Sequence, residues 1–189
     1  MDIMIIVYAV LAYFIGSIPS GLIIGKTFFN TDVRQYGSKN IGATNTYRVI
    51  GLKAALPVFL CDALKGAAGV VLLSSYGPMY MILGGILAMM GHNWSIFLGF
   101  KGGRGVATGL GVLIALSPLV ALLCFLVWGI IVYFTKLVSL GSIVAAALVP
   151  VLMYVTGESY WFVGFGGLAA LFVIVRHWDN IKRLLAGNE

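Results

Sequence analysis

Long apolar stretches alternate with short polar ones along the whole chain. The apolar stretches cover approximately residues 3–25, 54–74, 79–98, 106–117, 119–135, 140–156 and 160–176. Most of them approach the roughly 20 residues that a helix needs to cross the hydrocarbon core of a bilayer. The pattern predicts an all-α integral membrane protein, in which residues 1–189 form a single domain, a bundle of seven transmembrane helices.

The segment 106–135 allows two interpretations. It forms one long span, or it forms two short spans that break at Ser117-Pro118. Pro118 favours a break, because proline ends or kinks a helix and the residue before it avoids helical geometry. Each half is short for a bilayer of about 30 Å, so length alone does not decide between the two.

The distribution of Lys and Arg favours two short spans, and hence seven in total. With seven spans, eleven of the twelve Lys and Arg fall on one side of the membrane, and Lys65 lies inside a span. The basic stretches are the loops 26–53, 99–105 and 136–139 and the tail from Arg176. Because basic loops face the cytoplasm, we predict an outside N-terminus and a cytoplasmic C-terminus.

The composition agrees with a membrane protein and narrows the partners. Of the 189 residues, 61% are hydrophobic and 10% are charged, whereas soluble domains carry about a quarter charged residues. A net charge of +6 would suggest a nucleic-acid partner in a soluble protein, but here it reflects topology and anionic small molecules. Cys61 and Cys124 lie in apolar stretches, so we interpret them as core residues and expect no disulfide, metal or cofactor. The run from Ile3 to Ile24 has no basic start and no cleavage site, which indicates a retained span.

A polar, glycine-rich segment at 36–51 is the first candidate site. Its candidate side chains are Ser38, Asn40, Thr44, Asn45 and Arg48. They combine neutral hydrogen-bonding groups with one permanently charged guanidinium, and the neighbouring glycines let backbone amides approach an oxyanion. An ordinary connecting or re-entrant loop is the alternative.

A basic glycine loop that runs directly into the next span is the second candidate site. It consists of Lys101, Gly102, Gly103, Arg104 and Gly105. Free backbone amides and the positive end of the helix dipole favour an anion at such a junction, and two basic side chains add charge. The loop lacks the Lys-Ser/Thr ending of a Walker loop, so no magnesium nucleotide is expected. A loop whose charges only fix the topology is the alternative.

The C-terminal tail is the third candidate site. Helical spacing places His177, Asn180 and Leu184 on one face at the end of the last span. A histidine that only caps the helix or reaches towards the membrane surface is the alternative reading of His177.

Smaller polar sets lie within or beside the spans. Ser139 and Ser142 bracket the start of the sixth span, and His92-Asn93 lies near the end of the third. Asp62 and Lys65 are three residues apart in the second span and can pair on one helix face. Ionisable groups inside a membrane suggest a function, but a neutralised structural bridge explains this pair equally well.

Four separate motifs carry a resemblance to a known family. They are Gly16-Ser17-Ile18-Pro19-Ser20-Gly21, the run from Gly37 to Asn45 with Arg48, the run from Gly91 to Thr108, and Arg176-His177 with Asn180-Ile181 and Arg183-Leu184. Over nearly its whole length the chain resembles the bacterial acyl-phosphate:glycerol-3-phosphate acyltransferases, the PlsY family of phospholipid synthesis. Two departures are Lys39, where many relatives have Gly, and Ser95, where many have Pro.

The resemblance implies that three motifs on the cytoplasmic side supply the site, with no metal. The implied catalytic residues are His177, Ser38, Arg48 and Asn180. The implied substrate-binding residues are Lys39, Asn40, Thr44, Asn45, Lys101, Gly102, Gly103, Arg104, Gly105, Ser139, Ser142 and Glu189.

The implied reaction transfers an acyl group from acyl phosphate to the 1-hydroxyl of glycerol 3-phosphate. It yields 1-acylglycerol 3-phosphate and phosphate in the first step of phospholipid synthesis. The chain lacks the His-x4-Asp motif of acyltransferases that use coenzyme A or a carrier protein, since Phe97 and Lys182 stand at the Asp positions. We therefore expect a substrate-assisted route in which a phosphate oxygen accepts the hydroxyl proton, with His177 as the alternative base.

The expected partners are acyl phosphate, glycerol 3-phosphate and membrane lipid, with no nucleic acid. A monomer is the simplest oligomeric state, which the sequence leaves open. The expected location is the bacterial inner membrane, as a multi-pass protein with a cytoplasmic active site. A small transporter and a purely structural protein are competing classes. The absence of repeated halves disfavours the transporter, and the many polar residues next to lipid disfavour the structural protein.

Overall fold

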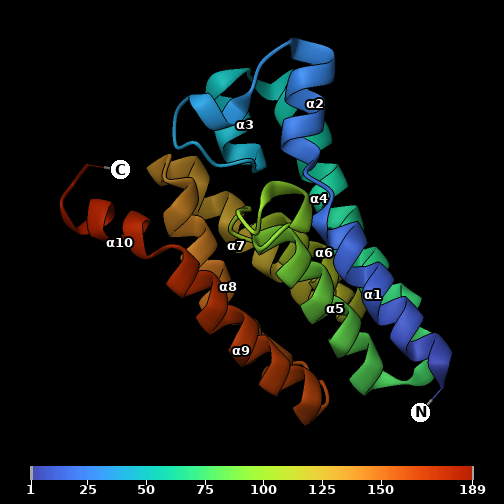
Figure 1. The fold of residues 1–189 in the computed structure, drawn as a ribbon. Helices are drawn as coiled ribbons and strands as arrows, with labels where there is room; N and C mark the ends of the chain where they lie inside the picture. Colours follow the sequence, from blue (N-terminus) through green and yellow to red (C-terminus); the bar gives the residue numbers. More distant parts are fainter. Residues whose placement is uncertain (1, 189) are drawn as a thin grey trace. The chain divides into compact units, whose positions relative to one another are not determined.

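Helices joined by short loops make up the protein, and a computed structural model describes residues 2–188. The helices are α1 (Ile3–Ser17), α2 (Ser20–Phe29), α3 (Ala43–Val49), α4 (Leu52–Leu72), α5 (Pro78–Asn93), α6 (Val106–Leu116), α7 (Pro118–Thr135), α8 (Val138–Val155), α9 (Tyr160–Arg176) and α10 (Trp178–Leu185). Short 3-10 turns add Val33–Gln35, Ser74–Tyr76 and Ile96–Leu98. The described residues contain no strand, which confirms the all-α prediction (Figure 1).

Several helices are long and apolar enough to cross a membrane. Four qualify singly, and six qualify if each of the bent pairs α1–α2 and α9–α10 counts as one span. Helix α6 is apolar but has only 11 residues, which rise about 17 Å and fall short of the bilayer core. A multi-pass membrane protein is therefore confirmed, whereas seven spans and the direction of the termini stay predictions.

Prolines divide two of the apolar stretches. Helix α6 ends at Leu116 and α7 begins at Pro118, so the segment 106–135 breaks where the sequence allowed a hairpin. The predicted span 3–25 is also divided, because α1 ends before Ile18-Pro19 and α2 continues at an angle of 45° to it. The same physical cause applies to both, since proline lacks the N–H that would continue the helical hydrogen bonds.

The chain forms two compact units, Met1–Ala115 and Leu116–Glu189. In the first unit α1, α4 and α5 pack against one another, and α2 and α3 lie against α4 (Figure 1). Backbones approach closely there: a Cβ added at Gly84 of α5 would lie 2.0 Å from the carbonyl oxygen of Gly69 on α4. Small residues at such contacts are typical of membrane helices.

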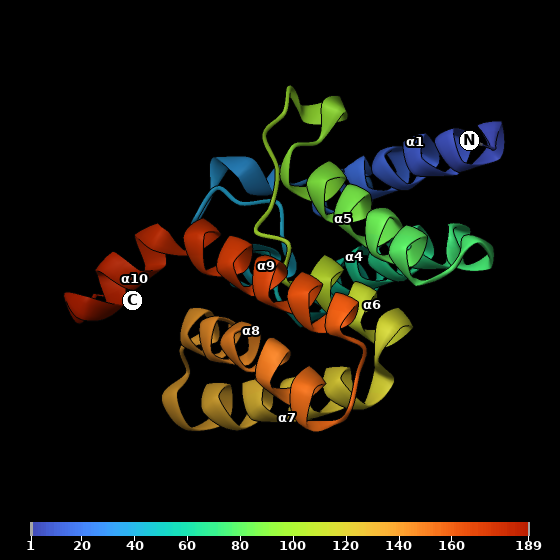
Figure 2. The same cartoon turned by 90° about the horizontal axis from the view of Figure 1, so that it is seen from below.

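The second unit is built on α8. Helices α7 and α9 both pack against α8, and α10 contacts α8 and α9 (Figure 2). The loop after α8 is held by a hydrogen bond from the Ser117 hydroxyl to the Glu158 carboxylate. This unit positions the residues of the C-terminal motif.

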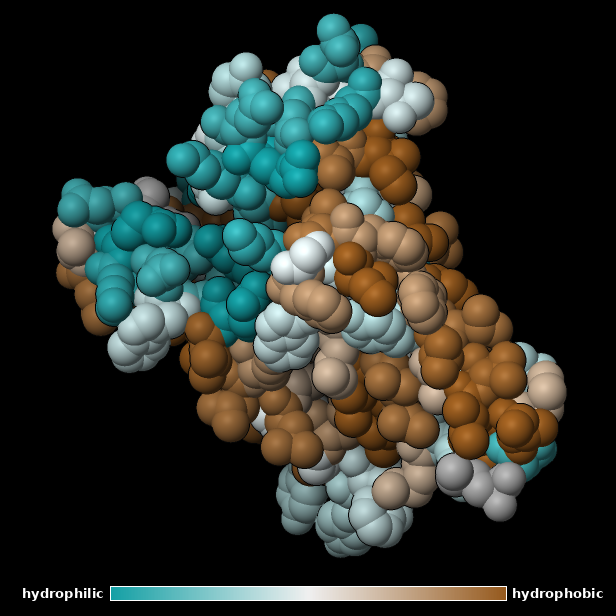
Figure 3. Space-filling model, in the orientation of Figure 1, coloured by the Kyte–Doolittle hydropathy of each residue, from teal (hydrophilic) through white to brown (hydrophobic). Residues whose placement is uncertain are grey.

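The surface of each unit separates polar from apolar residues. Figure 3 shows hydrophilic residues gathered over the α2–α3 region of the first unit and over α10 of the second. Large apolar side chains project outward from the longer helices, for example Leu64 on α4 and Leu168 on α9, each more than two-thirds exposed. Such exposed apolar faces suit contact with lipid.

Candidate active site

Asn45 organises the polar segment before and within α3. The two N–H groups of its Nδ2 are shared among three backbone carbonyl oxygens, those of Val33 at 2.8 Å, Tyr36 at 3.2 Å and Asn40 at 2.8 Å. Its Oδ1 accepts the backbone N–H of Ser38 at 2.8 Å. The side chain is only 2% exposed, so its polar atoms are engaged inside the segment.

The backbone around Ser38 turns through left-handed geometry. Gly37 has φ +56° and Lys39 has φ +58°, a region that costs a residue with a side chain roughly 1–2 kcal/mol. Lys39 therefore occupies a position that suits glycine, which gives a physical reason for the glycine that many relatives have there but does not explain the lysine of this chain. The side chains of Ser38, Lys39 and Arg48 are exposed, and that of Thr44 is half-buried.

Some basic residues near the two candidate loops form ion pairs and others do not. Asp32 Oδ2 lies 2.7 Å from Arg34 Nη2 and 3.3 Å from Lys26 Nζ. The hydrogen bond from Arg34 holds the pKa of the Asp32 carboxyl well below its usual range, against the opposing effect of burial. Among residues 2–188, by contrast, Arg48, Lys39 and Lys101 form no ion pair, so their charges remain available to an anion.

The glycine loop 101–105 rests on the last turn of α5. The Gly103 N–H donates to the His92 carbonyl oxygen at 3.0 Å. A Cβ added at Gly102 would lie 2.1 Å from that same oxygen, and one added at Gly103 would lie 2.1 Å from His92 Nε2. At Gly105, where φ is +83°, a Cβ would lie 2.9 Å from Asn93 Nδ2. The three glycines are thus required by packing, which adds to the anion-binding reason that the sequence offered.

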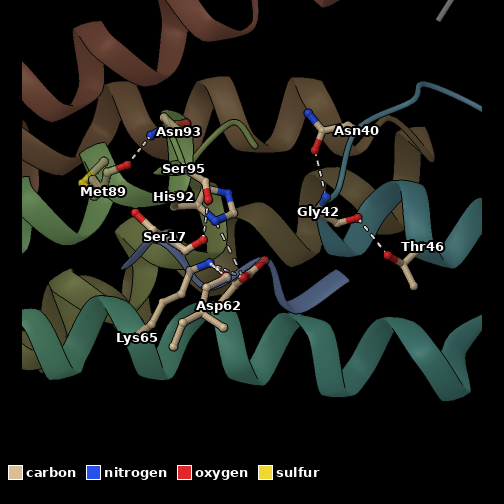
Figure 4. A network of polar contacts seen from close by, with 11 residues as sticks. Ser17, Asn40, Gly42, Thr46, Asp62, Lys65, Met89, His92, Asn93 and Ser95 are labelled. Atoms are coloured by element: carbon tan, nitrogen blue, oxygen red, sulfur yellow. Dashed lines mark hydrogen bonds and ion pairs between the residues drawn. The ribbon is translucent and has the colours of Figure 1, made fainter. Parts of the chain in front are cut away.

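A buried cluster of ionisable side chains joins α4 and α5 (Figure 4). Asp62 Oδ1 lies 2.7 Å from Lys65 Nζ and 3.7 Å from His92 Nδ1. The three residues are 2%, 5% and 3% exposed. The sequence predicted the pair on α4 and noted His92 separately, but it missed that His92 joins the pair, because helical spacing within α4 carries no signal for a partner on α5.

The second unit holds the other predicted site residues. His177 follows α9, and its Nδ1 lies 2.8 Å from the Val173 carbonyl oxygen. Since a carbonyl only accepts, this contact places a proton on Nδ1. His177, at the 60° bend between α9 and α10, and Asn180 on α10 are both buried.

Two serines of α8 are the remaining predicted site residues that the structure describes in the second unit. Ser139 and Ser142 are buried in the first turns of α8, the helix that α10 contacts. The Ser142 hydroxyl donates to the Val138 carbonyl oxygen at 2.8 Å. Glu189, also predicted as a binding residue, lies outside the described residues.

The candidate residues therefore divide between the units. The first unit contains Ser38, Lys39, Asn40, Thr44, Asn45, Arg48, Lys101, Gly102, Gly103, Arg104 and Gly105. The second contains Ser139, Ser142, His177 and Asn180.

The helices and their apolar exteriors define the chain as a multi-pass integral membrane protein. Comparison with known proteins makes the class specific. A family described as "Glycerol-3-phosphate acyltransferase" matches residues 6–187. The chain therefore belongs to the glycerol-3-phosphate acyltransferase family of the PlsY type.

Individual relatives agree over nearly the full length. The glycerol-3-phosphate acyltransferase of Fusobacterium nucleatum is 46% identical, over 96% of this chain and 95% of the relative. Glycerol-3-phosphate acyltransferase 2 of Moorella thermoacetica is 48% identical, over 95% and 93%. A solved crystal structure of PlsY, an integral membrane glycerol 3-phosphate acyltransferase in its glycerol 3-phosphate form, is 39% identical with a TM-score of 0.92. The match covers 98% of this chain and 94% of that one, and a second structure of PlsY is in the lysophosphatidic acid form.

Proposed function

We propose that this protein transfers an acyl group from acyl phosphate to the 1-hydroxyl of glycerol 3-phosphate. The hydroxyl oxygen forms a bond to the acyl carbon, and the bond from that carbon to the phosphate oxygen breaks. The products are 1-acylglycerol 3-phosphate (lysophosphatidic acid) and inorganic phosphate. Membership of the glycerol-3-phosphate acyltransferase family supports this reaction over the transporter and structural alternatives.

The glycine loop is the single observation that best supports phosphate-bearing substrates. Residues 101–105 lead into the start of α6, where backbone N–H groups lack helical partners and the helix dipole is positive. Lys101 is exposed and forms no ion pair with any residue of the described range 2–188, and Arg104 is partly buried in the same loop. The loop suits a compact dianionic head group.

The donor is proposed to be acyl phosphate because the basic surface is small. The longest predicted loop, residues 26–53, is largely occupied by α2, α3 and the turn that Asn45 holds. An acidic carrier protein or a coenzyme A nucleotide needs a sizeable interface or a formed pocket. A lipid tail with a phosphate head needs only the membrane and the loop.

The residues of the first unit would mainly bind and orient. A mixed anhydride is already activated, so the larger demand is to hold two phosphate-bearing reactants against their mutual repulsion. Lys101, Arg104 and the loop backbone would hold one phosphate, without the Gly103 N–H, which donates to the His92 carbonyl oxygen. Arg48 with Lys39 would add charge. Ser38, held by the Asn45 hydrogen bond, would contact the reacting groups.

His177 and Asn180 are proposed to hold a phosphate in a substrate-assisted route. The phosphate oxygen, rather than a side chain, would accept the proton of the attacking hydroxyl. Because the Nδ1 proton of His177 is directed to Val173, donation to a phosphate requires a second proton on Nε2. A neutral ring would instead present Nε2 as an acceptor, which is the state that the alternative role of general base needs.

The proposed location is the bacterial inner membrane, with the basic loops and the active site on the cytoplasmic side and the N-terminus outside. The distribution of Lys and Arg supports this orientation, because eleven of the twelve lie in the predicted cytoplasmic stretches. Seven spans are proposed, with α6 and α7 as the two short ones.

Acyl transfer by the purified protein in detergent tests the proposal. Radiolabelled glycerol 3-phosphate is supplied with palmitoyl phosphate, palmitoyl coenzyme A or palmitoyl carrier protein in parallel. Labelled lysophosphatidic acid is expected with palmitoyl phosphate alone. Comparable turnover with either thioester would contradict the proposed donor, and no transfer with any donor would contradict the reaction.

A further inference from the structure

A buried set of ionisable side chains in the first unit has no place in the proposed chemistry. Asp62, Lys65 and His92 are at most 5% exposed, so none of them contacts a substrate in solution. Burying charge in this way is costly unless the groups serve one another. We call these three residues the buried triad.

One side of the buried triad secures the end of α1. Lys65 Nζ donates to the carbonyl oxygen of Ile18 at 2.9 Å, at the point where Pro19 interrupts the helix. The neighbouring carbonyl oxygen of Ser17 accepts the Ser95 hydroxyl at 2.6 Å. Backbone groups freed inside a membrane must find partners, and these side chains supply them (Figure 4).

The other side of the buried triad faces the glycine loop. His92 Nδ1 lies 3.7 Å from Asp62 Oδ1, and a Cβ on Gly103 would lie 2.1 Å from His92 Nε2. The imidazole ring therefore lies between the Asp62 carboxylate and the backbone of Gly103. The carbonyl oxygen of the same histidine accepts the Gly103 N–H. His92 thus contacts the loop through both its backbone and its ring.

We propose that the buried triad is a positioning element for the glycine loop. Asp62, itself paired with Lys65, lies against one edge of the His92 ring at 3.7 Å and limits its movement, and His92 packs against Gly102 and Gly103. The loop is then held in one conformation before a phosphate arrives, which lowers the ordering cost of binding. The proposal rests on the phosphate role proposed for the loop and makes Asp62 and His92 positioning residues rather than catalytic ones.

A purely structural bridge between helices is the competing explanation, and a charge-free double variant separates the two. Asp62→Leu with Lys65→Met removes both charges at similar side-chain size, a change that buried ion pairs often tolerate without loss of stability. A simple bridge predicts normal substrate affinity in the folded double variant. The positioning role predicts folded protein in which KM for one phosphate-bearing substrate rises about tenfold or more while kcat changes less.

His92→Asn is a second variant, for the case that the double variant does not fold. It keeps the backbone bond to Gly103 and removes the ring, so the same rise in KM is expected. Glu158→Gln is the matched control, because it neutralises a partly buried carboxyl that pairs with Ser117 in the second unit. It should leave both KM values within about twofold of wild type.

Limited trypsin digestion gives a readout that does not depend on the loop binding phosphate. Cleavage after Lys101 or Arg104 should accelerate severalfold in the double variant, while cleavage after Lys53 at the start of α4 keeps its rate. Uniform acceleration at all sites, or wild-type KM and wild-type loop cleavage, would overturn the positioning role. If Arg104→Ala left both KM values unchanged, the phosphate assignment would fail, yet selective cleavage would still support the contact between triad and loop.

Discussion

The backbone N–H of Ser38 is held by the side-chain Oδ1 of Asn45, seven residues further along the chain. The two N–H groups of the same side chain are shared among three carbonyl oxygens, so one buried amide holds the turn that presents Ser38. A residue that sequence reasoning placed among the substrate contacts therefore has a clear structural task.

Replacement of Asn45 should damage the enzyme through this turn. Asn45→Ala leaves the buried carbonyl oxygen of Val33 without its partner, at about 1–3 kcal/mol, and also breaks three part-buried hydrogen bonds. Asn45→Asp keeps the acceptor for Ser38 but loses every donor. Both variants should lower thermal stability and activity together. Asn40→Ala is the control for stability, because it removes one hydrogen bond from the Gly42 N–H, and a loss of thermal stability as large as that of Asn45→Ala would contradict the central role of Asn45.

Arg104→Ala should weaken phosphate binding by about one to two decades in KM for at least one substrate. This is the value of a charge-assisted contact, about 1.5–3 kcal/mol. Arg34→Ala is the matched control, since Arg34 is a loop arginine already engaged by Asp32. If the charges served only topology, the two variants would behave alike in steady-state kinetics and in protein abundance.

The His177 series separates positioning from proton transfer. His177→Ala should be severely impaired, whereas His177→Asn or His177→Gln should keep measurable activity, because an amide donates a hydrogen bond but does not act as a base. Steady-state rates across pH 5–9 provide the check. Amide variants as inactive as Ala, together with a wild-type limb rising near pH 6.5, would instead identify His177 as the general base.

The orientation can be tested by cysteine labelling in intact cells. Single cysteines are placed at Lys101 and Asn188, on the predicted inner side, and at Ser159, on the predicted outer side, with Cys61 and Cys124 replaced. An impermeant maleimide should label only position 159 before permeabilisation. Labelling of position 101 or 188 from outside would reverse the proposed topology.

Lys39→Gly should be almost neutral for stability, within about 1 kcal/mol. Glycine relieves the left-handed backbone at φ +58° but increases the entropy of the unfolded chain by a similar amount. Lys53→Gly is the contrast, because Lys53 lies in the first turn of α4 and glycine costs about 1 kcal/mol in a helix. Equal melting temperatures for these two variants would argue against strain at position 39.

The sequence predicted well those features that depend on local order along the chain. Apolar runs placed α4, α8 and α9 to within a few residues, and Pro118 marked the break between α6 and α7. The equivalent signal at Pro19 was missed because the run from Ile3 to Ile24 was interpreted as one span, although Ser17 and Ser20 flank the proline. Helix α3 was missed because glycines and polar residues obscured its seven-residue span.

The hydrophobic periodicity of the sequence did not predict which side chains of different helices contact one another. Asp62 and Lys65 were paired from their spacing, but His92 joins them from another helix, 27 residues after Lys65. The loop glycines were assigned to anion binding, whereas their contacts with His92 and Asn93 follow only from packing. Local spacing thus located the candidate residues without showing what supports them.

The interruption of α1 at Pro19 couples distant positions in evolution and in design. Lys65 donates to the carbonyl oxygen of Ile18, beside the break, and Asp62 neutralises Lys65. If Pro19 were replaced and this helix became continuous, the Ile18 carbonyl oxygen would no longer need Lys65 as a donor. Without Lys65, the buried Asp62 carboxylate would lose its ion-pair partner and would destabilise the protein. Pro19, Lys65 and Asp62 should therefore be inherited and replaced as a group, and an engineer who changes one of them should change all three.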